Sequence, residues 1–327
     1  MKKKVCSVFL LVALVSALTA SIAAAAEKYD FSICGASIGG AWAAIGEGIG
    51  ETIRRSYPGS NTAYEVGQEA ANIALVSRGR VKLGIAHAQL IGIAAKGEEP
   101  FQGRNIDNLR AICVLYGEAM EQFMVKADTG IKNLGELKEK KYPLKMNLNT
   151  KDSFMEIVGK KTLEAYGITY ADIAKWGGKV DFMSMGSSLD LMRDGKIESY
   201  MNVIQIPSSH VVDVSTNIKL TMMPISKEVQ DKVNADIGTY SSVIPKGTYN
   251  FIDEDVPTVA ASVILFANAD LSDDEAYAIM KSIHENFGYF KNIHSSLKDA
   301  TLESMSKTAP VPLHPGAQKF FDEQAGK

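Results

Sequence analysis

Cysteine is scarce in this chain of 327 residues, which has three cysteines and only two tryptophans. So few cysteines exclude a small, disulfide-stapled scaffold. Glycine and proline, at 27 and 10 residues, are too few for a collagen-like repeat. With 46% hydrophobic and 22% charged residues, the composition is that of a globular chain and not of a disordered one. A chain of this length is expected to form about two domains.

Several enzyme signatures are also missing. The segment GASIGG, residues 35–40, lacks the Lys-Ser/Thr of a phosphate-binding loop and the central glycine of G-x-G-x-x-G. There is no H-E-x-x-H motif, and the five histidines do not cluster at metal-ligand spacing. We therefore expect no metal, no cofactor and no enzymatic activity.

Long hydrophobic runs are confined to the N-terminus. Residues 2–4 are lysines, an uncharged apolar run extends from Val5 to about Ile22, and residues 23–26 are alanines. This order predicts a signal peptide over 1–26, cleaved near Ala26, and a mature protein in the periplasm. The alternative is a membrane anchor, which the alanines and the lack of a second hydrophobic segment disfavour.

The net charge is modestly negative and becomes more negative after export. Removal of residues 1–26 deletes three lysines, so the formal net charge falls from -3 to -6. An acidic exported chain is a poor match for nucleic acid, which we exclude as a partner. Cys34 and Cys113 remain, and the sequence is compatible both with a disulfide and with two buried free thiols.

A unit of strand, polar turn and helix occurs twice. Apolar residues alternate over 29–33 and predict a strand, which the glycine-rich turn 35–40 and an amphipathic helix follow. In the middle of the chain, a strand over 144–148 is followed by the polar turn 149–153 and a helix over 154–166. Further patterns predict a helix over 69–78, strands over 81–86, 109–116 and 259–267, and a long helix over 270–290 capped by Ser272 and Asp273. Strands that alternate with helices predict an α/β fold with a largely parallel sheet.

Both polar turns suit a ligand carboxylate. The start of a helix offers unpaired N–H groups and the positive end of its dipole, and Ser37, Thr150 and Ser153 add hydroxyl donors. The alternative is that the glycines of 35–40 merely permit a tight turn.

The first turn also permits a competing hypothesis. Residues 35–39 match the G-x-S-x-G nucleophile elbow, so a secreted serine hydrolase using Ser37 is the alternative function. The position of this turn on the first strand of the mature chain disfavours it, and no aspartate stands three residues before His284, His294 or His314.

Four blocks carry a family resemblance: 66–89, 185–201, 244–260 and 312–321. Together with the first turn, they resemble the TAXI group, the solute receptors of tripartite ATP-independent periplasmic (TRAP) transporters. The resemblance implies a type II-like, two-lobed periplasmic binding protein with a ligand cleft between the lobes and hinge strands. Lobe one would comprise 27–118 and 262–327, and lobe two 119–261. Such a receptor captures a small organic anion (a dicarboxylate, keto acid or acidic amino acid) and delivers it to TRAP permease subunits.

The resemblance also implies which residues meet the ligand. They are Ser37, Gly39, Gly40, Trp42, Asn72, His87, Asn149, Thr150, Ser153 and Gln205. Gln205, like Tyr64 and Asp152, lies next to a matched position and is a weaker candidate. Trp42 stands where the family usually has tyrosine, and residues 87–89 replace the usual Gln-Ser-Asp. The ligands of relatives therefore do not transfer to this chain. A core role for Trp42 and a purely structural hydrogen bond for His87 are the alternatives.

Overall fold

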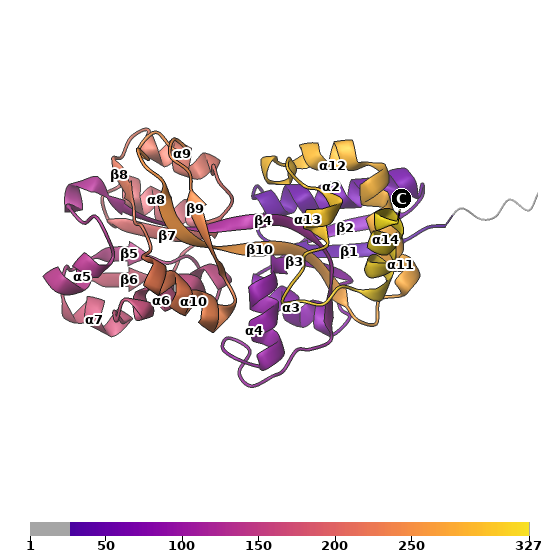
Figure 1. Ribbon diagram of the computed structural model, residues 1–327, viewed down its shortest axis with the longest axis horizontal. Coiled ribbons are helices and arrows are strands. Elements are labelled where there is room, and N and C mark those ends of the chain that lie inside the picture. Colours follow the sequence, from indigo (N-terminus) through magenta and orange to yellow (C-terminus); the bar gives the residue numbers. More distant parts are fainter. Residues whose placement is uncertain (1–26, 327) are drawn as a thin grey trace, which may run out of the picture.

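The computed structural model describes residues 27–326, so the predicted signal peptide lies outside the described residues. Figure 1 shows two halves that lie side by side and are joined by strands β4 (Leu109–Lys126) and β10 (Val256–Asn268). Within residues 27–326, no helix is both long and apolar enough to cross a membrane.

The first half is built on three parallel strands. β1 (Asp30–Gly35) pairs with β2 (Asn61–Val66) on one side and β3 (Leu83–His87) on the other. Each strand leads into a helix: α2 (Ala41–Ser56), α3 (Glu69–Ser77) and α4 (Ala88–Lys96). The C-terminal helices α11 (Asp273–Glu285), α12 (Phe287–Ile293), α13 (Leu302–Met305) and α14 (Pro315–Ala325) complete this half.

The second half repeats the plan with shorter strands. β5 (Lys145–Asn147) pairs in parallel with β6 (Lys179–Asp181) and β7 (Ser199–Ile204). Its helices are α5 (Gly135–Lys140), α6 (Phe154–Ala165), α7 (Tyr170–Lys175), α8 (Met185–Arg193), α9 (Ser209–Ser215) and α10 (Lys227–Ile237). The strands β8 (Leu220–Met222) and β9 (Tyr240–Ile244) pair with β4 and β10.

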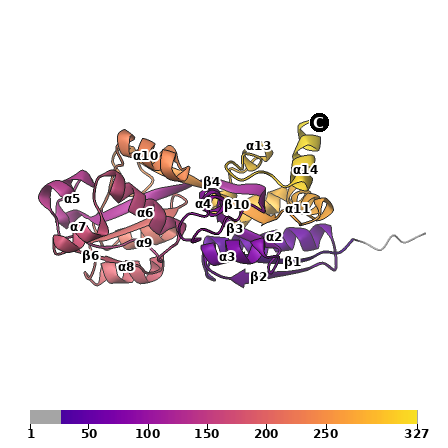
Figure 2. The same ribbon diagram turned by 90° about the horizontal axis from the view of Figure 1, so that it is seen from below.

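Two long strands cross between the halves. The strand order is β2-β1-β3-β10-β4-β7-β5-β6. Residues 256–260 of β10 pair with β9 in the second half, and residues 263–267 pair with β3 in the first. Similarly, residues 109–120 of β4 pair with β10, and residues 120–125 pair with β7 in the second half. Figure 2 shows the same two strands in the narrow region between the halves.

Two sequence-based expectations about the fold are wrong. The sheet is mixed and not largely parallel, because every pairing that β4 and β10 make is antiparallel. The predicted helix over 270–290 is two helices, which meet at Asn286, a residue with non-helical φ -110 and ψ 28. The amide of Asn286 donates to the carbonyl of Ser282 at 2.9 Å and so caps the end of α11. At the other end, Ser272 is the N-cap and forms a capping box with Glu275, so the helix begins at Asp273.

The two remaining cysteines are free and buried. Cys34 lies on β1 and Cys113 on β4, and the structure contains no bond between them in the described part of the chain. Burial raises the pKa of the Cys34 thiol to about 12, with a smaller contribution from the charge of Glu65. Both cysteines therefore act as small core residues.

Candidate ligand-binding site

The first polar turn joins β1 to the start of α2. Gly39 has φ 87, a conformation that favours glycine, and Gly40 is the N-cap of α2, with its N–H 3.3 Å from the carbonyl of Ser37. Ser37, Gly39 and Gly40 are exposed. Tyr64 supports the turn, because its hydroxyl donates to the carbonyl of Ala36 at 2.7 Å. The unpaired N–H groups at the start of α2 thus remain available to a ligand.

Asn72 holds the start of α3 against the end of β1. Its side-chain amide donates to the carbonyl of Gly35 at 2.9 Å, and the residue is 1% exposed. Gly67 is required beside it, since a Cβ there would lie 2.0 Å from Asn72 Oδ1. Asn72 therefore fixes the end of β1, where the first turn begins, relative to α3.

His87 is the last residue of β3 and the N-cap of α4, and it is paired with a carboxylate. The main-chain N–H of His87 donates to Glu69 Oε1 at 2.6 Å, and the ring Nδ1 lies 2.9 Å from the same oxygen. The two side chains are only 2% and 4% exposed. Glu69 is the first residue of α3, so this pair joins the starts of α3 and α4.

The second polar turn is built around Asn149, whose φ of 72 lies in the left-handed region. Its Nδ2 donates to Tyr200 Oη and to Asn202 Oδ1, both at 3.0 Å, and its Oδ1 accepts the N–H of Thr150 at 2.7 Å. Ser153 then caps α6 by accepting the N–H of Glu156 at 3.2 Å. Asp152 is exposed with φ 62, and Thr150 is half-buried.

Aromatic contacts bring these helix starts together. The ring of His87 lies 4.6 Å from that of Phe154, the first residue of α6, and 5.4 Å from that of Trp42 in the first turn of α2. Trp42 Nε1 also donates to Tyr116 Oη on β4 at 2.9 Å. We name Trp42, Glu69, His87, Tyr116 and Phe154 the seam cluster. At this cluster four helices begin, three from the first half and one from the second.

Comparison with known proteins places the chain in a family. The sequence model of the NMT1-like family matches residues 33–325. The chain belongs to the NMT1-like family.

Solved structures agree on the fold of this NMT1-like protein. The periplasmic binding protein BugD matches with a TM-score of 0.55 at 13% identity, over 92% of this chain and 95% of that chain. A structure described as a periplasmic transporter matches with a TM-score of 0.51 at 14% identity, over 91% of this chain and 93% of that one. The NMT1-like protein thus has the two-lobed α/β fold of periplasmic binding proteins, and its halves are the lobes.

Gln205 follows β7 and lies beside a cavity that Tyr116 of the seam cluster also lines. The cavity has a volume of about 390 Å³, and Ser262 of β10 lines it as well. Its Oε1 is buried and has no hydrogen-bond partner among residues 27–326. Tyr116 therefore belongs both to this cavity and to the seam cluster.

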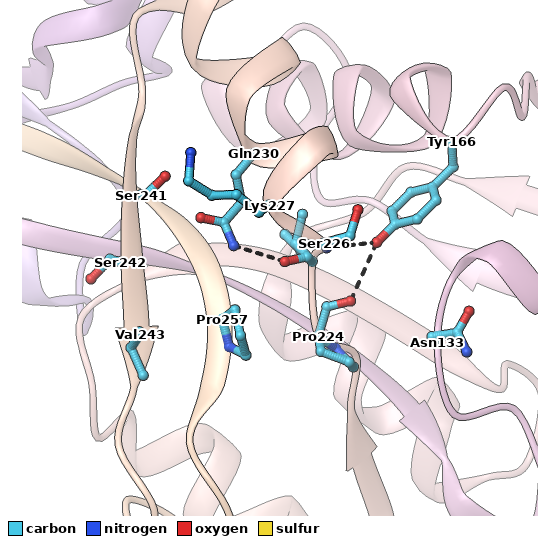
Figure 3. Close-up of a pocket in the computed structure, with 11 residues that line it drawn as sticks. Asn133, Tyr166, Pro224, Ser226, Lys227, Gln230, Ser241, Ser242, Val243 and Pro257 are labelled. Carbon is cyan, nitrogen blue, oxygen red and sulfur yellow. Dashed lines mark hydrogen bonds between the residues drawn. The ribbon is translucent and has the colours of Figure 1, made fainter.

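A second hollow has a volume of about 560 Å³. Figure 3 shows it in lobe two, between the start of α10, strand β9 and Tyr166. Tyr166 Oη accepts the N–H of Ser226 at 3.0 Å and donates to the carbonyl of Pro224 at 3.4 Å. None of the residues predicted to meet the ligand lines this hollow.

Three members of the seam cluster were missed by sequence reasoning: Glu69, Tyr116 and Phe154. Each lies next to a feature that the sequence does predict, namely the start of the helix over 69–78, the end of the strand over 109–116 and the start of the helix over 154–166. What the patterns cannot provide is the pairing between elements. Glu69 and His87 are 18 residues apart, and Trp42 and Tyr116 are 74 apart.

Proposed function

We propose that this NMT1-like protein is a solute receptor that works in the periplasm and traps a small organic anion between its lobes. The observation that carries the proposal is the convergence of four helix starts, those of α2, α3, α4 and α6, on His87 at the seam of the lobes. Helix starts favour an anionic group through their unpaired N–H donors and their dipoles. The residues proposed to meet the solute are Ser37, Gly39, Gly40, Trp42, Asn72, His87, Asn149, Thr150, Ser153 and Gln205.

Local donors must supply the affinity. The formal net charge is -3 for the full sequence, so the protein as a whole does not attract an anion over long distances. Charge-assisted hydrogen bonds contribute about 1.5–3 kcal/mol each, so three or four provide much of the roughly 8 kcal/mol needed for micromolar binding.

Hinge closure is the proposed mechanism of capture. We assign lobe one to 27–118 and 262–327 and lobe two to 119–261, with the hinge where β4 and β10 cross. The register shift in β10 between Ala261 and Val263 supports this boundary, because an irregular pairing bends more easily than a regular one. Closure would bring the turns 35–40 and 149–153 onto opposite sides of one solute.

The proposed partner is a TRAP permease. This part of the proposal rests on the four sequence blocks that resemble the TAXI group. Delivery would then require no ATPase, because an ion gradient drives such permeases.

The serine hydrolase alternative finds no support in the contacts of Ser37. The ring nitrogens of His87, His294 and His314 contact Glu69, Ser296 and Leu271 instead. Among residues 27–326, no histidine ring is hydrogen-bonded to Ser37, and an exposed serine without such a base is a poor nucleophile.

Isothermal titration calorimetry tests the proposal. The ligand-free protein is titrated with dicarboxylates, keto acids and acidic amino acids, and we expect micromolar or tighter binding of at least one. Ser37→Ala and Thr150→Ala should each weaken that binding while circular dichroism stays unchanged. Ser215→Ala, at a half-buried residue of α9, is the control. If no compound of the panel bound, the organic-anion proposal would be overturned. Unchanged affinity in both variants would show that the binding site does not include Ser37 or Thr150.

A further inference from the structure

We infer that the solute carries an ammonium group and that Glu69 recognises it. This inference rests on the proposed function and narrows its ligand class to amino acids. One oxygen of Glu69, Oε1, is already engaged by the N–H and the ring of His87, at 2.6 and 2.9 Å. The other oxygen, Oε2, is buried and accepts no hydrogen bond within residues 27–326.

A buried carboxylate oxygen without a donor is unfavourable. Removing it from water forfeits strong hydration, which only a hydrogen bond or a positive charge replaces. In the described part of the chain, no lysine or arginine forms an ion pair with Glu69, and its single ion-pair partner is His87. A donor that arrives from outside the protein would therefore gain a charge-assisted hydrogen bond at Oε2.

The location of Glu69 favours the solute as the source of that donor. Glu69 contacts His87, and the ring of His87 lies against those of Phe154 in lobe two and Trp42 in lobe one. Glu69 thus lies within the cluster where the lobes meet. Burial raises the pKa of Tyr116 against the opposing hydrogen bond from Trp42, and the charge of Glu69 raises it further, so this neighbour remains a neutral hydroxyl.

The chemistry of Oε2 separates the candidate ligands. An amino acid and its 2-oxo acid differ in one substituent: an ammonium donates hydrogen bonds, whereas a keto oxygen only accepts them. A keto oxygen or a second carboxylate next to Oε2 would place lone pairs against lone pairs. An ammonium at Glu69 leaves the carboxylate of the same molecule free to occupy the helix starts of α2 and α6.

Matched pairs of ligands provide the test. Calorimetry compares L-glutamate with 2-oxoglutarate, L-aspartate with oxaloacetate, L-alanine with pyruvate, and L-leucine with 4-methyl-2-oxopentanoate. We expect at least one amino acid to bind 100-fold more tightly than its own 2-oxo acid. Glu69→Gln should weaken the binding of that amino acid at least tenfold, whereas Glu65→Gln, an exposed carboxylate of β2, should leave it unchanged.

The outcomes separate the two proposals. If a 2-oxo acid or glutarate binds as tightly as the matching amino acid, the ammonium inference is overturned while the receptor function stands. The ammonium inference also fails if Glu69→Gln folds normally and keeps full affinity for the amino acid. If Glu69→Gln does not fold, the wild-type comparison within each pair decides alone. Binding of none of these carboxylates would overturn the organic-anion proposal itself.

Discussion

The imidazole of His87 lies against the ring of Phe154 in a tilted contact, with their centroids 4.6 Å apart and their planes inclined by 30°. This contact joins the last residue of β3 in lobe one to the first residue of α6 in lobe two. It is therefore a direct link between the lobes that does not pass through the crossing strands β4 and β10.

Removal of this contact should loosen the arrangement of the two lobes. Phe154 is fully buried, so Phe154→Ala is expected to lower the free energy of unfolding by about 3–5 kcal/mol. Phe290→Ala removes an equally buried ring from α12, away from the seam, and should cost a similar amount. Small-angle X-ray scattering should show a larger radius of gyration for Phe154→Ala only. Identical scattering of the two variants would contradict the role of this contact.

The shape of the first turn should depend on Gly39. With φ 87, this position strains any other L-residue, although a Cβ there would meet no atom within 4 Å. Gly39→Ala is thus expected to cost about 1–2 kcal/mol of stability and to weaken ligand binding about tenfold. Gly288→Ala, also free of steric contact but inside α12, should instead stabilise by about 0.5–1 kcal/mol with binding unaltered. Thermal melting and calorimetry on both variants check the contrast.

Glu121 should make stability depend on pH. Burial raises the pKa of its carboxyl to about 8, against an opposing hydrogen bond from Thr162 Oγ1 at 2.8 Å. Because the folded pKa lies above the unfolded one, this group's contribution is fully present below about pH 4 and is lost as pH rises to about 8. Glu121→Gln should therefore be more stable than wild type at pH 9, by on the order of 2–4 kcal/mol. Its free energy of unfolding should also change less with pH between about pH 4 and pH 9.

The control for Glu121 lies on the same strand. Glu118→Gln changes an exposed carboxyl of β4 and should preserve the wild-type pH dependence. Urea denaturation at pH 5, 7 and 9 measures all three proteins. A parallel pH profile for Glu121→Gln and wild type would show that Glu121 is ionised in the folded protein at neutral pH.

The two cysteines should be protected thiols. Both are buried, Cys34 on β1 and Cys113 on β4, and burial raises the pKa of each. A thiol reagent such as DTNB should modify neither in the native mature protein and both in guanidinium chloride. Only one outcome supports a disulfide: no reaction in guanidinium chloride until a reductant is added.

The local elements were largely predictable from the sequence. The polar turns 35–40 and 149–153, the capping serine Ser272 and the helix starts all follow from short-range patterns, which depend on residues three or four apart. The break between α11 and α12 at Asn286 could not be predicted in this way. The side-chain amide of Asn286 bonds to a helix carbonyl, and apolar periodicity does not report such a bond. Strand β2 was not predicted because its residues are mostly exposed or half-buried and form no apolar run.

The candidate site was predictable in part. His87 and Trp42 were selected by the family resemblance, at positions that the sequence patterns place at the end of a strand and in the first turn of a helix. Their partners Glu69, Tyr116 and Phe154 required the fold, because strand order decides which loop ends become neighbours. The antiparallel pairing of β4 and β10 could not be predicted for the same reason. Whether two strands run parallel or antiparallel depends on the long connections between them.

The central claim is that a small solute lies between the helix starts of the two lobes. A crystal structure of the mature protein, with the solute that copurifies or with the tightest ligand from calorimetry, tests it most directly. We predict density for one small carboxylate in contact with the turn 35–40, with residues 149–153 and with the seam cluster at His87. Density for the ligand in the hollow beside Tyr166 and Ser226, with the seam unchanged, would contradict the account.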